Sequence, residues 1–243
     1  MSELETAGPV ALVGSGEFLE QMVPVDAELL EGRPPRAVFL PTAAAEEGPQ
    51  RVKYWTALGT SHYSAMGVEP VPLMVLDRED AERPELAAKV AGAGLVYLSG
   101  GNPGYLAHTL AGTAVWEAIL EAWRAGAALG GCSAGACALS RVAYDFRHPD
   151  RYSGQGLSVV PEMVVIPHFD RFEHWLPGLV GQVLTRMPND AVLVGIDEDT
   201  ALVGDAGRFV VRGEKSVWRI DADGARSQFK PGEQLELDAT RAR

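Results

Sequence analysis

The sequence predicts an α/β fold: a doubly wound, mostly parallel sheet flanked by helices, with a β-rich C-terminal extension. Short apolar runs alternate with helix-like segments through the first two thirds of the 243 residues. Several of these runs are apolar at successive positions, which is typical of parallel strands buried on both faces. In the last part of the chain, short strands separated by turn residues replace this alternation.

The elements expected in the first part follow the alternation. Strands are expected at residues 10–13, 36–40, 68–76, 94–98 and 127–129. Helices are expected between them at residues 50–66, 81–91 and 113–123. Right-handed crossovers between such strands give an open sheet with helices on both sides.

The last third has a different pattern. Residues 157–166 resemble a strand, and residues 172–186 resemble a helix that is bent or interrupted near Pro177. Later turn signals fall at residues 204–205, 207, 213–214 and 223–224. Because no linker, repeat or low-complexity block interrupts the chain, we expect a single domain over residues 1–243, β-rich from about residue 191.

Composition and charge exclude several classes of protein. Hydrophobic residues make up 47% and charged residues 22% of the chain, as in globular proteins. The formal net charge of −12 repels phosphate backbones and anionic lipids, so we expect no nucleic-acid or membrane partner. No basic leader or run of about 18 apolar residues is present. The two cysteines, Cys132 and Cys137, are too few for a disulfide scaffold. We expect a soluble, cytoplasmic protein.

The segment Gly131-Cys132-Ser133-Ala134-Gly135 fits the pattern G-x-S-x-G. In this pattern the serine occupies a strained turn between a strand and a helix, and its hydroxyl is exposed above the carboxyl ends of the strands. Glycines are needed because a Cβ on either side would collide with the neighbouring strand or helix. An apolar run precedes the segment, and residues able to start a helix follow it. Ser133 is therefore the candidate nucleophile of a hydrolase; a glycine-rich packing turn is the alternative.

A second glycine-rich turn, residues 99–104, follows another expected strand. If the two strands are neighbours, a backbone N–H of this turn and the N–H of Ala134 can together bind the oxyanion of an acyl-transfer reaction. The alternative is an ordinary strand-to-helix turn in which Asn102 caps the next helix. The local sequence leaves both interpretations open.

Among the five histidines, His168 is the candidate general base. It follows a strand-like run, at an edge where the loops of an α/β sheet gather. The consecutive acids Asp197, Glu198 and Asp199 follow a later apolar strand, and one of them is a candidate to orient the imidazole. The alternative for these acids is a solvated turn.

Some of the same residues are also candidates for a metal or cofactor site. His168, Asp170 and His174 could ligate an ion, but no H-E-x-x-H or paired-cysteine spacing is present, so we expect no metal. The first glycine turn, residues 14–16, lacks the third glycine of a dinucleotide fingerprint because residue 19 is leucine. We expect no cofactor.

Taken in order, these residues resemble the peptidase E and cyanophycinase family of serine peptidases, whose fold is like that of class I glutamine amidotransferases. The matching segments are residues 13–17 (VGSGE), 100–102 (GGN), 133–136 (SAGA), 167–169 (PHF) and 195–202 (GIDEDTAL). The resemblance implies a triad of Ser133, His168 and Glu198, and an oxyanion hole formed by the N–H groups of Gly101 and Ala134. The chain order of serine, histidine and acid differs from that of α/β-hydrolases.

The resemblance also implies hydrolysis, through an acyl-enzyme, of a peptide or isopeptide bond next to an aspartyl residue in a peptide or small amide substrate. Arginines could bind the acidic group by bidentate contacts. The candidates are Arg141, Arg147, Arg151 and Arg171, and the expected substrate-binding residues are Asn102, Arg147 and Arg171.

Two departures leave the exact activity open. Cyanophycinases usually have a run of the type R-x-R-x-x-R-L after the histidine, where residues 171–176 here read RFEHWL. Peptidase E has an N-D-containing loop after the elbow, where residues 144–148 here read YDFRH. The activity is therefore expected to be either dipeptidase E-like or cyanophycinase-like.

Two other functions remain open for the same fold. A glutamine amidotransferase-like enzyme would need a cysteine at the elbow, where this chain has Ser133 with Cys132 one place before it. A non-catalytic binding protein would retain the same glycines. A homodimer is the default expectation for such a domain.

Overall fold

The computed structural model describes residues 7–144, 152, 154–175, 178–205 and 207–237. Eight strands form the main sheet, in the order β12-β9-β8-β1-β5-β4-β2-β3. Its parallel half consists of β1 (Val10–Val13), β5 (Ala128–Cys132), β4 (Leu95–Leu98), β2 (Arg36–Leu40) and β3 (Glu69–Pro72). On the other side of β1, the antiparallel strands are β8 (Thr200–Asp205), β9 (Arg208–Gly213) and β12 (Gln234–Glu236).

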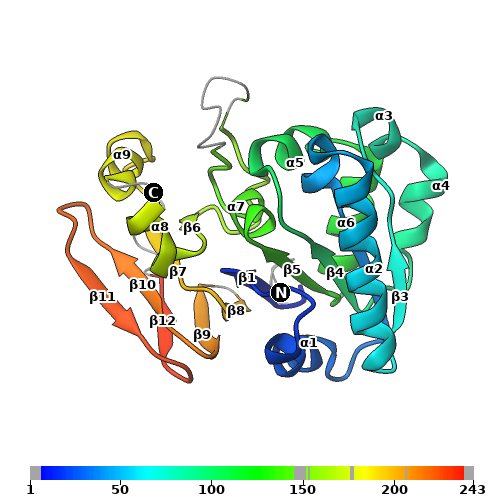
Figure 1. The fold of residues 1–243 in the computed structure, drawn as a ribbon, viewed down its shortest axis with the longest axis horizontal. Helices are drawn as coiled ribbons and strands as arrows, with labels where there is room; N and C mark the ends of the chain where they lie inside the picture. Colours follow the sequence, from blue (N-terminus) through cyan, green and yellow to red (C-terminus); the bar gives the residue numbers. More distant parts are fainter. Residues whose placement is uncertain (1–6, 145–151, 153, 176–177, 206, 238–243) are drawn as a thin grey trace.

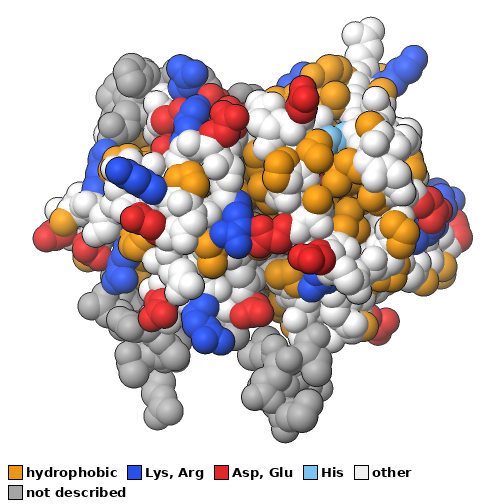
Figure 2. All heavy atoms as spheres, turned by 90° about the horizontal axis from the view of Figure 1, so that it is seen from below, with side chains coloured by type: hydrophobic (Ala, Val, Ile, Leu, Met, Phe, Trp, Pro, Cys, Tyr) orange, Lys and Arg blue, Asp and Glu red, His pale blue; other side chains and the backbone are white. Residues whose placement is uncertain are grey.

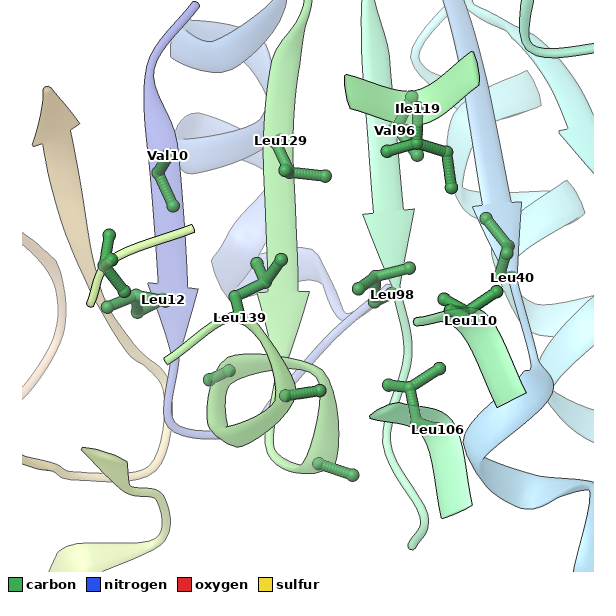
Figure 3. Packing of buried hydrophobic residues seen from close by; sticks show 14 of the residues in the cluster. Val10, Leu12, Leu40, Val96, Leu98, Leu106, Leu110, Ile119, Leu129 and Leu139 are labelled. Carbon is green, nitrogen blue, oxygen red and sulfur yellow. The ribbon is translucent and has the colours of Figure 1, made fainter. Parts of the chain in front are cut away.

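Helices cover both faces of the parallel half (Figure 1). Successive side chains of a strand point to opposite faces, and accordingly Val10 and Leu12 pack in one core layer while Ala11 and Val13 pack in the other. The first layer is covered by α3 (Arg78–Ala81), α4 (Pro84–Ala87), η4 (Ala88–Val90), α5 (Pro103–Leu110), α6 (Ala114–Arg124) and α7 (Ala134–Leu139). Figure 3 shows this layer, with leucines of α5 and α7 against strand side chains. The second layer is covered by α1 (Val23–Leu30) and α2 (Pro49–Ala65).

A second sheet lies beside the first, in the order β11-β10-β7-β6. Its strands are β6 (Met163–Ile166), β7 (Val192–Ile196), β10 (Val217–Ile220) and β11 (Arg226–Phe229), of which β6 and β7 are parallel. The helices α8 (Phe169–Trp175) and α9 (Leu179–Arg186) belong to this part of the molecule (Figure 1). Here Phe169, Leu179 and Val183 pack in a third apolar cluster with strand residues.

The predicted fold class is confirmed, with a partition that the sequence did not reveal: the C-terminal strands are divided between the two sheets. The strands at 10–13 and 36–40 have the predicted bounds. The helix predicted at 81–91 is instead α4 followed by the short 3-10 helix η4. Pro84 stands in the first turn of α4, where its missing N–H costs no hydrogen bond, so a new helix begins there.

Smaller differences follow the same logic. The helix predicted over 172–186, bent or interrupted near Pro177, is the pair α8 and α9: the interruption is confirmed, and the first helix begins earlier, at Phe169. The strand predicted over 157–166 is limited to β6. The helix α1 and the 3-10 helices η2 (Glu20–Met22) and η3 (Thr42–Glu47) were not predicted, and α5 corresponds to the helix that Asn102 caps in one of the two interpretations of residues 99–104. All four lie in the connections that follow β1, β2 and β4.

Acidic and basic side chains are both present on the one face of the molecule drawn in Figure 2, despite the net charge of −12. On the face seen in Figure 2, hydrophobic side chains gather mainly on one half, and acidic and basic side chains are mixed over the rest. In the described residues, no helix is long and apolar enough to cross a membrane.

Candidate active site

Ser133 occupies the turn between β5 and α7, as the sequence predicts. Its φ of 51° and ψ of −108° place it in a conformation that L-residues rarely adopt. A Cβ at Gly131 would lie 2.5 Å from the carbonyl carbon of Gly135, and a Cβ at Gly135 would lie 2.1 Å from the carbonyl oxygen of Leu98. Both glycines are therefore required for α7 to pack against the strand that leads into it and against β4.

Ser133 lies at one end of a chain of hydrogen bonds. Its Oγ is 3.0 Å from Nε2 of His168, and Nδ1 of His168 is 3.1 Å from Oε1 of Glu198. The three residues stand just after β5, just after β6 and just before β8, which all meet at one edge of the fold. His168, like Ser133, has a positive φ, of 49°. The structure thus brings together the three residues that the sequence singled out, although 35 and 30 positions separate them along the chain.

The other histidines are placed elsewhere or are not described. His62 is buried and its Nε2 lies 2.7 Å from Oδ2 of Asp26, inside the core. His108 is exposed on α5. His148 lies outside the described residues, and nothing is described of the His174 side chain.

Of the three consecutive acids, only Glu198 reaches His168. Asp197 accepts hydrogen bonds from the N–H of Ser216 and from Trp218, and Asp199 accepts one from Gln21. Glu198 also accepts a hydrogen bond from Nε of Arg171 at 3.1 Å. Partial burial opposes ionisation, but the hydrogen bonds from His168 and Arg171 outweigh it and lower the pKa of the Glu198 carboxyl.

A second carboxylate, that of Asp170, binds the backbone of Glu198. Oδ1 of Asp170 accepts the backbone N–H of Glu198 at 2.9 Å, and Oδ2 of Asp170 accepts from Nζ of Lys215 at 2.8 Å. Desolvation by itself would raise the pKa of Asp170. The hydrogen bonds from Lys215 and from the Glu198 backbone have a larger, opposite effect, so the pKa of Asp170 is lowered. His168 and Asp170, which were weighed as metal ligands, therefore engage different protein partners. In the described residues, no group of three His, Cys, Asp or Glu side chains is arranged to hold a metal ion.

The second glycine-rich turn lies beside the elbow, because β4 and β5 are neighbours. Gly101 has a φ of 144°, and a Cβ there would lie 2.2 Å from the carbonyl oxygen of Ala43. Within the described part of the chain, neither the N–H of Gly101 nor that of Ala134 donates to a protein acceptor. Asn102 caps α5 by accepting the N–H of Tyr105, and its Nδ2 donates to Glu46. The two interpretations of this turn are therefore compatible, since the cap and the free N–H groups come from different residues.

Glu17 connects this turn to the elbow. Its carboxylate is 5% exposed, Oε1 accepts the N–H of Gly100 at 2.9 Å, and Oε2 accepts the thiol of Cys132 at 2.8 Å. One side chain thus holds the residue before Gly101 and the residue before Ser133. Burial, and then the nearby Glu17 carboxylate, raise the pKa of the Cys132 thiol well above its ordinary value.

The edge that carries Ser133 and His168 opens into a cleft of about 370 Å³. Ser133, His168, Gly100, Gly101 and Glu17 form its floor. The rest of the lining is Ser15, Gly16, Leu19, Glu47, Arg51, Tyr54, Trp55 and Leu58. The contribution from α2 was not predicted. Glu17 does carry a signal in the sequence, because it is an acid directly after the glycine turn that follows the first strand.

Of the arginines named as candidates for substrate binding, the two that the structure describes, Arg141 and Arg171, do not line this cleft. Arg141 pairs with Asp190 at 2.8 Å, and Arg171 pairs with Glu198. Arg147 and Arg151 lie outside the described residues. Asn102 is not among the residues that line the cleft.

The chain is similar in sequence to proteins of a known family. The family model of peptidase family S51 matches residues 10–211. A cyanophycinase from Synechococcus elongatus is 30% identical over 166 residues, which are 64% of this chain and 51% of that protein. A cyanophycinase from Trichormus variabilis is 30% identical over 169 residues, 65% of this chain and 56% of that protein. The chain thus spans about half the length of the curated relatives it matches.

Solved structures agree over more of the chain. A peptidase from an acI-B1 Actinobacterium is 38% identical, with a TM-score of 0.87, and the match covers 95% of this chain and 97% of that one. A protein from Listeria monocytogenes EGD-e assigned to peptidase E shares the fold, with a TM-score of 0.64 at 20% identity, over 86% of this chain and 100% of that one. Because the family model spans most of the chain and a solved peptidase overlays nearly all of it, the chain belongs to peptidase family S51.

Proposed function

We propose that the protein hydrolyses a peptide or isopeptide bond through a Ser133-His168-Glu198 triad and a covalent acyl-enzyme. The observation that carries the proposal is the hydrogen-bond chain from Ser133 Oγ through His168 to Glu198, which opens into a cleft. A serine hydroxyl is a weak nucleophile until an adjacent base removes its proton, and an imidazole held by a carboxylate is such a base.

In this mechanism Glu198 accepts a hydrogen bond from the Nδ1–H of His168, and this tautomer leaves Nε2 free to take the proton of Ser133. Oγ attacks the amide carbonyl, and the tetrahedral oxyanion is bound by the N–H groups of Gly101 and Ala134. His168 then gives its proton to the departing amine, which breaks the C–N bond and leaves the acyl-enzyme. A water molecule, deprotonated by His168, releases the acid and restores the serine.

The proposed substrate is a peptide cleaved next to an aspartyl residue, in the manner of dipeptidase E or of cyanophycinase. This preference rests on the resemblance and on the cyanophycinase relatives. The described arginines named for it, Arg141 and Arg171, are each paired with an acid of the chain itself. Asp-Xaa dipeptides, isoaspartyl peptides and cyanophycin form the panel that separates these activities.

The nucleophile is tested by labelling with a fluorophosphonate and mapping the modified peptide. We expect the label on Ser133 and its loss in Ser133→Ala. The variant Ser61→Ala, which changes an exposed serine on α2, is the control and should label like the wild type. Labelling of Ser15, which lines the same cleft, in place of Ser133 would overturn the assignment.

The same variants test the two alternatives. A glutamine amidotransferase-like activity would release ammonia from glutamine and would depend on Cys132 rather than Ser133. The buried Cys132 thiol with a raised pKa is a poor source of thiolate, so we expect no such release. A non-catalytic protein would hydrolyse none of the panel and would bind the same ligands after Ser133→Ala.

A further inference from the structure

One wall of the catalytic cleft is apolar and exposed. In the described residues, three large hydrophobic side chains are exposed: Leu19 at 40%, Tyr54 at 50% and Met74 at 38%. Leu19 and Tyr54 both line the cleft, together with Trp55 and Leu58, whereas Met74 does not. Exposed apolar side chains gathered in a concave surface mark a place where a ligand is bound.

The wall is held in place before any ligand arrives. The guanidinium of Arg51, one helical turn before Trp55, lies 5.2 Å from the ring centre of Tyr54 and 5.0 Å from that of Trp55. Its Nε pairs with Glu47 at 3.2 Å. The two rings meet edge to face, with their centres 5.2 Å apart. A wall fixed in this way loses little conformational entropy when it is covered.

We propose that Leu19, Tyr54, Trp55 and Leu58 form a subsite for a large apolar side chain, such as leucine or phenylalanine, on one of the two residues that flank the scissile bond. This subsite rests on the proposed function of Ser133. The wall and Ser133 line one cleft of about 370 Å³, so a peptide whose carbonyl lies at Ser133 has its neighbouring side chains within reach of the wall.

The charges of the cleft support this choice over an acidic side chain. Its described lining contains two carboxylates, of Glu17 and Glu47, and one arginine, Arg51, which Glu47 already pairs. An acidic side chain placed on this wall would lie near these carboxylates without a free cation to pair with in the described lining, which is electrostatically unfavourable. An aspartyl residue at the cleaved bond therefore belongs on the side of the bond away from this wall.

The test is a series of matched peptides with alanine, leucine, phenylalanine or aspartate at either flanking position. We expect kcat/KM for leucine or phenylalanine to exceed that for alanine by about tenfold or more at one of the two positions. In Tyr54→Ser and Leu19→Ser this advantage should shrink several-fold, mainly through KM. Met74→Ser removes the exposed hydrophobic side chain outside the cleft and should retain the full advantage.

Equal kcat/KM for alanine and the large apolar residues at both positions would overturn the subsite, as would an equal loss in Met74→Ser. Calorimetric binding of the same peptides to Ser133→Ala tests the subsite without turnover. If apolar peptides bind more tightly than alanine peptides and Tyr54→Ser removes the difference, the subsite stands even where Ser133 proves not to be the nucleophile. Labelling of Ser133 together with no apolar preference in either assay would leave the proposed function and reject the subsite.

Discussion

The floor and the wall of the catalytic cleft are built in different ways. The floor is made of main-chain turns at the ends of several strands, and they are packed so closely that a Cβ at Gly101 or Gly135 would lie within 2.3 Å of a backbone atom. The wall consists of side chains from one helix and one loop, among which Leu19 and Tyr54 remain largely exposed. The floor is therefore suited to fixed chemistry, and the wall can change its side chains without disturbing the fold.

Backbone strain is concentrated on the floor side. In the described residues, five non-glycine residues have a positive φ: Phe18, Ser133, Ser158, His168 and Asp199. All except Ser158 either belong to the proposed triad or directly follow one of Glu17 and Glu198. Such conformations persist where the surrounding structure fixes them, and they gather at functional sites.

The largest effect is expected at the floor, from His168→Ala. Without the imidazole, the Ser133 hydroxyl loses the base to which it is hydrogen-bonded, so kcat should fall by about four orders of magnitude or more. Steady-state kinetics on a cleaved dipeptide and a thermal melt measure activity and folding separately. His108→Ala, at an exposed histidine on α5, should keep wild-type activity. Near-normal turnover of folded His168→Ala would contradict the assignment of the chemistry to the floor residues.

A smaller loss is expected from Glu17→Gln. The glutamine can still accept the N–H of Gly100 through its oxygen, but its amide group would replace the acceptor that now faces the Cys132 thiol. The elbow and the Gly101 turn should lose their alignment, and kcat should fall about 10- to 100-fold, with a small change in KM. Glu20→Gln, three residues away and exposed, is the matched control. A change confined to KM would instead make Glu17 a substrate-binding residue.

Replacing the carboxylate of Asp170, which binds the backbone of Glu198, should mainly reduce the stability of the fold. The pKa of Asp170 is lowered from its ordinary value of 3.8, so the shift stabilises the fold above that value and is lost as the pH falls through the folded-state pKa. Asp170→Asn should therefore lower Tm by about 2–4 °C at pH 7, from a loss of about 1 kcal/mol. The difference should shrink towards pH 3. Glu236→Gln, at an exposed acid of β12, should show no such trend. A difference that does not vary with pH would mean that the charge of Asp170 is not what stabilises the fold.

The features that could be predicted from the sequence are those that depend on residues close together in the chain. The strand at 10–13, the elbow at Ser133 and the cap at Asn102 each depend on neighbouring residues, and each was found as predicted. Contacts between distant segments could not be predicted from such patterns. Glu17 meets Cys132 across 115 positions, and Asp170 meets Lys215 across 45, only because β1 pairs with β5 and the C-terminal strands are divided between two sheets.

The same limit applies to Arg171. From the sequence it was a substrate-binding candidate, since its position after His168 places it near the site, but its partner depends on where Glu198 lies. In the structure its Nε donates to Glu198, and its side chain is 56% exposed. An ion pair this exposed contributes little to stability.

The smallest effect is therefore expected from Arg171→Gln. If Arg171 acts by holding Glu198, the loss in kcat should be less than about fivefold and equal for acidic and neutral substrates, because His168 still donates to Glu198. Kinetics on paired Asp-containing and Asn-containing dipeptides measure this. Arg212→Gln, which breaks a comparable ion pair with Glu28 away from the cleft, is the control. A rise in KM confined to the acidic substrate would show instead that Arg171 contacts substrate, and would extend the binding surface beyond the α2 wall.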